Sequence, residues 1–137
     1  MTPEEKNELI RAATAVAARA YAPYSGFRVG AAVMASGGRI YTGANVENAS
    51  FGLSLCAERA ALAAARSAGE KAISAIAVVC IDRPTGAPLE EVLPCGGCRQ
   101  WIQELAPEAE IIVAGHAEIL RIEHLLPRPF RLRPPRT

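Results

Sequence analysis

The sequence predicts an α/β fold, a three-layer α/β/α domain built around a mixed sheet of approximately five strands. Strand-like and helix-like segments alternate along the chain in the order α-β-β-α-β-α-β-β, which is typical of layered α/β architectures. Residues 72–81, AISAIAVVCI, are almost continuously apolar, as expected of a central strand covered on both faces. Residues 56–68 are rich in alanine and apolar nearly all round, which indicates a buried helix.

Each element follows from a local pattern. Thr2 can cap a helix, Pro3 suits its first turn and Glu5 occupies the capping-box position, so a helix is expected from Pro3 with apolar residues recurring to Ala20. The predicted strands, most of them bounded by turn residues, are 28–34, 39–45, 72–81, 110–115 and 118–122. The other predicted helices are 56–68, which stops at Gly69, 95–105, which ends before Pro107, and a short turn at 123–126.

Length and composition indicate one globular domain. The chain has 137 residues, the size of an ordinary domain, and no linker or internal repeat divides it, so residues 1–137 are expected to form a single unit. Half of the residues are hydrophobic and 21% are charged, which is a globular rather than a disordered composition. Residues 131–137, RLRPPRT, are expected to form a flexible basic tail.

Charge and hydropathy exclude several partner classes. The net charge is only +1, so no global field favours nucleic acid, a membrane or an acidic partner. The purely apolar runs are far shorter than the roughly 18 residues of a transmembrane helix. The N-terminal stretch carries acid where a signal peptide carries base, which predicts a cytoplasmic protein with reduced thiols. Its four cysteines are therefore expected to be metal ligands or buried thiols.

Three of the cysteines stand where predicted helices begin. Cys95 and Cys98 in PCGGCRQ have C-x-x-C spacing, so on a helix they share a face and can hold one ion together. Cys56 likewise stands at the start of the alanine-rich helix. Helix N-termini supply unpaired N–H groups and a positive dipole end, which favour thiolates. These sulfurs predict a zinc site whose fourth position is open to water, the pattern of catalytic zinc.

Two other interpretations of the cysteines stay open at this point. A lone C-x-x-C is often redox-active, and a fourth thiolate from Cys80 would make a purely structural zinc site. Cys80, however, lies among apolar residues near the end of a predicted strand, where a free cysteine commonly acts as a small hydrophobe.

Two charged residues follow Cys56 at the start of an otherwise apolar helix. Glu58 is interpreted as a general acid/base acting on a zinc-activated water, although it could also serve only to complement the helix dipole. Three thiolates outweigh the charge of a zinc dication, which weakens the metal as a Lewis acid. We therefore predict that Arg59 donates to one or more of the thiolates, the alternative being a surface arginine.

The combined motifs resemble a known enzyme family. C-x-E followed by P-C-x-x-C is the signature of the zinc nucleobase deaminases. The stretches YAPYSGFRVGAAV, TGANVENASFG, LCAERAAL, LPCGGCRQ and HLLPRPF, taken together, are similar to the small bacterial cytidine deaminases. The resemblance implies a cytidine deaminase-like fold and one zinc ion per subunit, bound by Cys56, Cys95 and Cys98. It also implies hydrolytic deamination of cytidine and 2′-deoxycytidine to uridine and 2′-deoxyuridine, with release of ammonia, in pyrimidine salvage.

The resemblance further implies roles for individual residues. Zinc-bound hydroxide would attack C4 of cytosine, with Glu58 as the proton shuttle. The implied substrate-binding residues are Asn45 and Glu47 on the sugar hydroxyls, Phe27 on the pyrimidine, Phe130 reaching into a neighbouring subunit's site, Ala57, and Phe51, which stands where many relatives have tyrosine. The implied assembly is a homotetramer whose active sites are completed by neighbouring subunits.

Three other functions compete with this one. A deaminase of another small cytosine-containing molecule, such as blasticidin S, would not need the ribose pair Asn45 and Glu47. A nucleic-acid cytosine deaminase is disfavoured by the balanced charge and the few aromatic residues, despite the basic tail. A non-catalytic zinc-binding module would not need Glu58. The two histidines, His116 and His124, are expected at the surface or an interface rather than as ligands.

Overall fold

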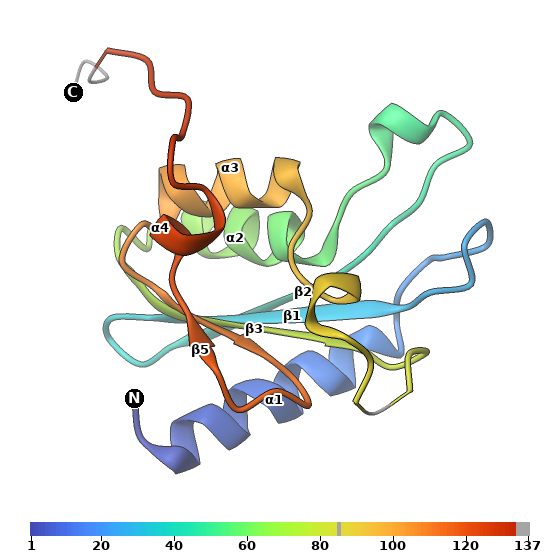
Figure 1. The fold of residues 1–137 in the computed structure, drawn as a ribbon, viewed down its shortest axis with the longest axis horizontal. Coiled ribbons are helices and arrows are strands. Elements are labelled where there is room, and N and C mark those ends of the chain that lie inside the picture. The colour runs from blue at the N-terminus through green and yellow to red at the C-terminus, as the bar shows by residue number, and fades with distance from the viewer. Residues whose placement is uncertain (85, 134–137) are drawn as a thin grey trace.

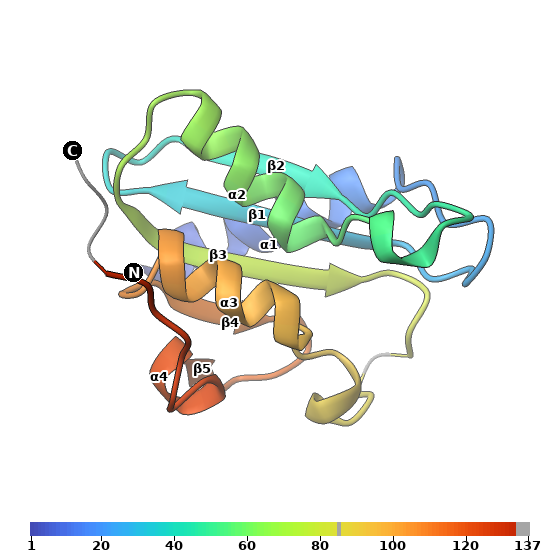
Figure 2. The same ribbon diagram turned by 90° about the horizontal axis from the view of Figure 1, so that it is seen from above.

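A mixed sheet forms the middle layer of the molecule (Figures 1 and 2). The structure is a computed structural model that describes residues 1–84 and 86–133, so the part of the predicted basic tail that includes Arg136 lies outside the described residues. Within these residues the sheet has five strands in the order β2-β1-β3-β4-β5. Their bounds are β1 Val29–Ala35, β2 Ile40–Ala44, β3 Ile73–Cys80, β4 Glu110–Val113 and β5 Ile119–Leu120. Only the β3–β4 pair is parallel among these neighbours, which confirms the mixed sheet.

Helices cover both faces of the sheet. Helix α1 (Pro3–Ala17) lies on one face, and α2 (Ala57–Ser67), α3 (Gly96–Leu105) and the short α4 (Ile122–Leu125) lie on the other (Figure 1). Each interface has its own apolar core. Leu9 and Ala13 of α1 pack with one set of strand residues, and Leu62 and Ile102 of α2 and α3 pack with the opposite set. The predicted three-layer α/β/α architecture is confirmed.

Local signals explain where the first helix begins and ends. The Thr2 hydroxyl accepts a hydrogen bond from the Glu5 backbone, and the Glu5 carboxylate accepts one from the Thr2 backbone, so the expected capping box is formed. The helix ends at Ala17, earlier than the apolar spacing to Ala20 indicates. The chain turns there because the Tyr21 backbone N–H donates to the Asn45 carbonyl instead.

Two glycines let the helices approach the sheet closely. A Cβ on Gly30 would lie 2.8 Å from the Ala17 nitrogen and also clash with the Ala13 carbonyl of α1. A Cβ on Gly43 would lie 2.6 Å from the Ala60 Cβ of α2. Both helices therefore cross the sheet at positions where no side chain fits. The absence of a side chain at Gly43 sets how closely α2 packs on β2.

Helix α2 is buried on one side only within a single chain. Ala61, Leu62 and Ala65 are fully buried against the sheet, whereas Ala64 is exposed. The predicted burial of this apolar helix is therefore confirmed for the face turned toward the sheet, whereas the face that carries Ala64 is not covered within one chain. Among the described residues, no helix is both long enough and apolar enough to span a bilayer.

Candidate zinc and substrate site

Three cysteine sulfurs converge from the N-termini of two helices. Cys56 is the N-cap residue of α2, Cys95 is the N-cap residue of α3, and Cys98 lies in the first turn of α3. The Cys56 and Cys95 sulfurs are 3.9 Å apart, and those of Cys95 and Cys98 are 3.6 Å apart. All three sulfurs lie within 4.8 Å of one another, and neither Cys80 nor the two histidines belong to this group.

The spacing of these sulfurs fits zinc. With a Zn–S distance of about 2.3 Å, two sulfurs of a tetrahedral site lie about 3.8 Å apart. The separations of 3.9 and 3.6 Å bracket this value, and thiolate sulfur is a ligand that zinc readily takes. Three protein ligands leave one position open, as in catalytic sites, and a four-cysteine structural site is not formed.

An arginine lies against the cluster from α2. The Nη2 of Arg59 donates to the Cys56 sulfur at 3.4 Å and to the Ser54 carbonyl at 3.0 Å. Contacts with the Cys98 thiol and with the Arg59 guanidinium lower the pKa of Cys56 to about 5. The contact with Cys56, together with burial, raises the pKa of Cys98.

Glu58 is a buried carboxylic acid beside these sulfurs. It lies in the first turn of α2 and is only 5% exposed. Burial raises its pKa to about 7, and the neighbouring Cys56 charge acts in the same direction. Its side chain lines the same cavity as Cys56 and Cys95, so the acid, these two cysteines and any bound molecule share one space.

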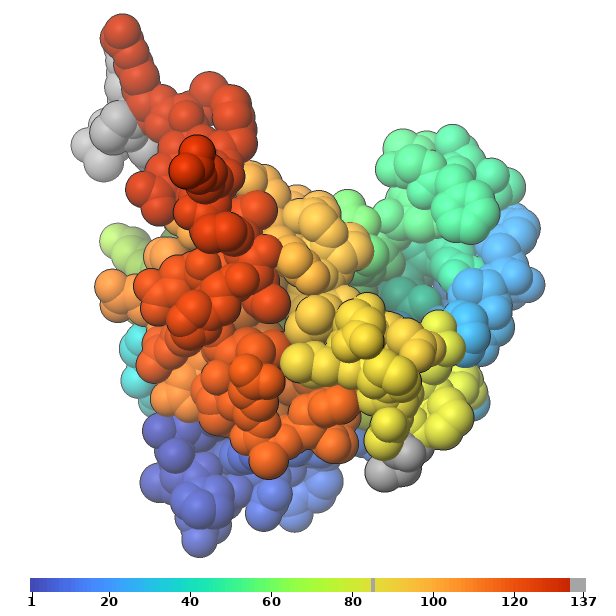
Figure 3. Space-filling view, viewed as in Figure 1, coloured from blue at the N-terminus to red at the C-terminus, as the bar shows by residue number. Residues whose placement is uncertain are grey.

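The cavity has a volume of about 250 Å³ and opens at the end of the sheet where β1 begins and β3 ends. The surface is hollowed between the segment around residue 50 and the segment around residues 89–95 (Figure 3). The residues that the motifs identified and that line it are Phe27, Asn45, Cys56, Ala57, Glu58 and Cys95. The sequence analysis assigned no substrate role to the other lining residues, which are Val29, Val78, Cys80, Arg83, Glu91, Val92 and Leu93.

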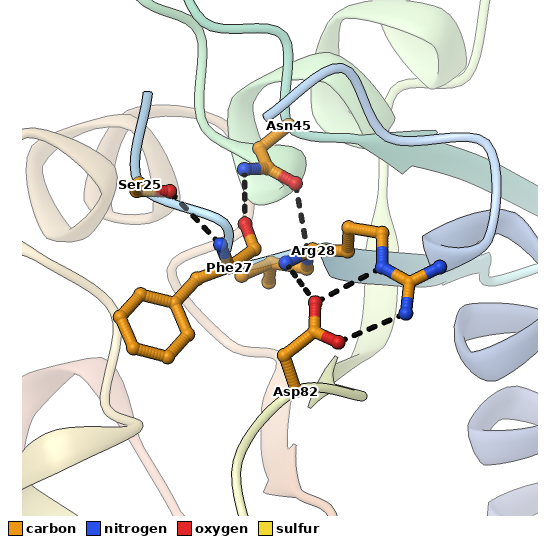
Figure 4. A network of polar contacts seen from close by, with 6 residues as sticks. Ser25, Phe27, Arg28, Asn45 and Asp82 are labelled. Carbon is orange, nitrogen blue, oxygen red and sulfur yellow. Dashed lines mark hydrogen bonds and ion pairs between the residues drawn. The ribbon is translucent and has the colours of Figure 1, made fainter. Parts of the chain in front are cut away.

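Asn45 and Glu47 tie down the segment that leads into β1. The amide oxygen of Asn45 accepts from the Val29 backbone at 2.7 Å, and its nitrogen donates to the Phe27 carbonyl at 2.8 Å (Figure 4). The Glu47 carboxylate accepts hydrogen bonds from the Ser25 hydroxyl and backbone, which lower its pKa. Asn45 faces the cavity, whereas Glu47 is not among the residues that line it.

An ion pair joins the same segment to the end of β3. Arg28 donates from Nε and Nη2 to the two oxygens of Asp82, at 3.0 and 2.9 Å, and its backbone N–H donates to Asp82 at 2.8 Å (Figure 4). These bonds lower the pKa of Asp82 to about 2. No motif pointed to this pair, and no sequence pattern connects the two residues.

Two aromatic residues of the expected site lie outside the cavity lining. Phe51 is 76% exposed in the one-turn helix η1 (Phe51–Leu53), and Phe130 is 68% exposed near the described C-terminal end. Gln100 of α3 donates to the Phe130 carbonyl at 2.9 Å and so fixes the segment that carries Phe130. His116 lies half-buried, with its Nε2 3.0 Å from the Ala87 carbonyl, and His124 is exposed.

A three-layer domain with three thiolates and a buried carboxylic acid at its helix ends defines the class of zinc-dependent deaminases. The family model of the cytidine and deoxycytidylate deaminase zinc-binding region matches residues 3–114. The chain belongs to this family.

Individual relatives agree with this assignment. A cytidine deaminase from Halalkalibacterium halodurans is 42% identical over 130 residues, which cover 92% of this chain and 94% of the relative. A cytidine deaminase from Mycobacterium tuberculosis is 42% identical over 120 residues, which cover 88% and 85%. The crystal structure of a cytidine deaminase from Burkholderia pseudomallei superposes with a TM-score of 0.81 at 43% identity, covering 95% of this chain and all of that one (100%).

Proposed function

We propose that this protein hydrolyses cytidine and 2′-deoxycytidine to uridine and 2′-deoxyuridine with release of ammonia. The observation that carries the proposal is the buried Glu58 carboxyl beside the three-sulfur cluster, with Glu58, Cys56 and Cys95 lining a single cavity. The relatives that match nearly the whole chain are cytidine deaminases, which supports the substrate. Cys56, Cys95 and Cys98 would hold zinc, which when bound supplies Lewis-acid chemistry that makes water a stronger nucleophile near neutral pH.

Glu58 moves the protons of the reaction. Its carboxylate takes a proton from the attacking water and delivers it to N3 of the cytosine. The C4–O bond forms, the C4–N4 bond breaks, and the amino group leaves as ammonia with the second proton of the water. The burial of Glu58 and Ala57 limits bulk water at this point, so the protons pass through the carboxylate.

The substrate is held by one aromatic and two polar side chains. Phe27 packs on the pyrimidine, and Asn45 and Glu47 bind the sugar hydroxyls. Asn45 has the capacity for this role because each of its amide atoms makes one bond within the chain and keeps a second lone pair or hydrogen. Glu47 is already ordered by Ser25, so its carboxylate is preorganised when a hydroxyl arrives.

The decisive experiment is Glu58→Gln with two readouts. The amide keeps the shape and hydrogen-bonding capacity of the side chain but cannot shuttle a proton, so ammonia release should fall by a factor of about 10²–10⁴. Zinc content should stay at that of the parent, because Glu58 is not one of the three ligands. A parent protein that binds zinc but releases no ammonia from cytidine would refute the enzyme and favour a zinc-binding module.

Alternative substrates are tested with the same assay. Cytidine, 2′-deoxycytidine, blasticidin S and a single-stranded DNA containing cytosine are offered to the parent protein at equal concentration. We expect turnover of the two nucleosides. Faster turnover of blasticidin S, or activity on the DNA alone, would replace the nucleoside as the substrate.

We also propose that the active form is a homotetramer in the cytoplasm that acts in pyrimidine salvage. Phe51, Leu53 and Phe130 are 76%, 72% and 68% exposed, which is unusual for large apolar side chains unless another surface covers them. In the tetramer Phe130 reaches a neighbour's site and the exposed Ala64 face of α2 is covered. Four free cysteines, three of them clustered, suit a reducing compartment. Light scattering across a concentration series tests the assembly, and a monomer with full activity would refute it.

A further inference from the structure

The loop after β3 brings a cation into the wall of the substrate cavity. The guanidinium carbon of Arg83 lies over the Phe27 ring, 4.4 Å from the ring centroid. Its Nη1 is 3.2 Å from a carboxylate oxygen of Glu91, which belongs to the one-turn helix η2 (Leu89–Glu91). Arg83, Glu91 and Phe27 all line the cavity that contains Glu58.

The backbone of Phe27 is fixed separately from its ring. The Phe27 N–H donates to the Ser25 hydroxyl at 3.0 Å, and its carbonyl accepts from Asn45 at 2.8 Å. The ring extends away from these contacts (Figure 4), and the residue is 39% exposed. The orientation of the ring therefore depends on what packs against its faces, and Arg83 packs against one of them.

Arg83 is itself held from two directions. The residue before it, Asp82, is bound by Arg28, the residue that follows Phe27, so the two backbones are clamped side by side. From the other direction Glu91 orients the guanidinium and balances its charge. These contacts within the chain hold the flat cation over the ring.

We propose that Arg83 is a positioning residue for the substrate base. Its guanidinium covers one face of the Phe27 ring, so that the ring presents its other face to the pyrimidine, and Glu91 keeps the guanidinium in place. The inference rests on the proposed function, because it takes Phe27 as the aromatic side chain that packs on the base. Arg83 touches neither the sulfurs nor Glu58 in any contact described above, so its effect falls on binding rather than on the chemical step.

The first test separates KM from kcat. Arg83→Ala should raise the KM for cytidine by roughly 2- to 5-fold, the factor that corresponds to one exposed cation–π contact, and leave kcat unchanged. Arg83→Lys keeps the charge but lacks the flat surface, so it should restore only part of the affinity. Arg11→Ala, an exposed arginine of α1 on the other side of the sheet, is the matched control and should keep the parent KM. Zinc content and melting temperature are measured for each variant.

The second test asks whether Arg83 acts through Phe27. Phe27→Leu removes the ring, so adding Arg83→Ala to it should leave the KM where Phe27→Leu alone puts it. The proposal would be overturned if Arg83→Ala raised the KM by the same factor in the parent and in the Phe27→Leu variant. It would also be overturned if Arg83→Ala left the KM of the parent unchanged. An unchanged KM for Phe27→Leu in an active enzyme would also overturn it, because Phe27 would then not be the side chain that packs on the base. A parent with no deaminase activity would instead overturn the proposed function, so the two failures are distinguishable.

Discussion

Gly43→Ala tests how strictly the packing of α2 sets the geometry of the zinc ligands. A Cβ at Gly43 would lie 2.6 Å from the Ala60 Cβ and also against the Ala61 backbone nitrogen, whereas ordinary contacts begin at 3.4 Å. Neither neighbour is the end of a flexible side chain. To restore ordinary contacts the helix therefore has to retreat from β2 by at least the difference between these two values, 0.8 Å, because the Ala61 nitrogen lies closer still.

The retreat has two consequences. Overpacking of this kind costs about 1–3 kcal/mol of unfolding free energy, which corresponds to a melting temperature lower by roughly 3–15 °C for a domain of this size. It also moves Cys56, which begins α2, relative to Cys95 and Cys98 of α3. Ligand distances in metal sites are held to about ±0.2 Å, so zinc affinity should fall together with stability.

The assay compares Gly43→Ala with Gly37→Ala. A Cβ at Gly37 meets nothing within 4 Å, so this control adds the same methyl group without a clash. Thermal unfolding followed by circular dichroism gives the melting temperatures, and competition with a chromophoric chelator gives the zinc affinities. The reasoning is refuted if Gly43→Ala melts within a degree or so of Gly37→Ala and retains zinc equally well.

Two further changes probe the charged groups around the site. Arg59→Gln removes the charged donor from the Cys56 thiolate, so zinc retention after dialysis or turnover should decrease, and parent values of both would contradict this role. Asp82 has a pKa near 2 in the folded chain against 3.8 ordinarily, so it stabilises the fold above about pH 4 and loses this contribution as the pH falls through 2. Asp82→Asn should therefore flatten the decline of unfolding free energy across that window, and Glu90→Gln, which replaces an exposed carboxylate, should not.

The parts of the molecule that could be predicted from the sequence are those with a local or periodic signal. The capping box at Thr2 and the apolar run of β3 each depend on residues close together in the chain, so composition and spacing were sufficient. The three sulfurs were predictable for a related reason, since each stands at or next to a helix N-terminus that its own segment defines. The convergence of those two helix ends then follows from the packing of α2 and α3 on one face of the sheet.

The parts that could not be predicted depend on pairs of residues far apart in sequence. Arg28 and Asp82 are separated by 54 positions, and although Arg28 lies in the stretch YAPYSGFRVGAAV, no pattern links it to Asp82. Arg83 lies in a loop without periodicity, so nothing in its neighbourhood indicates that its guanidinium lies over Phe27. A run of alanines shows that a helix tolerates burial but not which of its faces is covered, so only the structure shows that the uncovered face of α2 is the one with Ala64.

The buried acid and the sulfur cluster depend on one another. Glu58 is only 5% exposed and lies two residues from Cys56, so two groups that become negative when ionised share a space with little water. Such an arrangement is unfavourable by itself, because burying like charges costs free energy unless cations balance them. Arg59 contacts Cys56 and supplies one positive charge, and the N-termini of α2 and α3 supply partial ones. A divalent cation bound by the sulfurs would supply the remaining positive charge. Metal binding should therefore stabilise this end of α2 and reduce the free-energy cost of burying a charged Glu58.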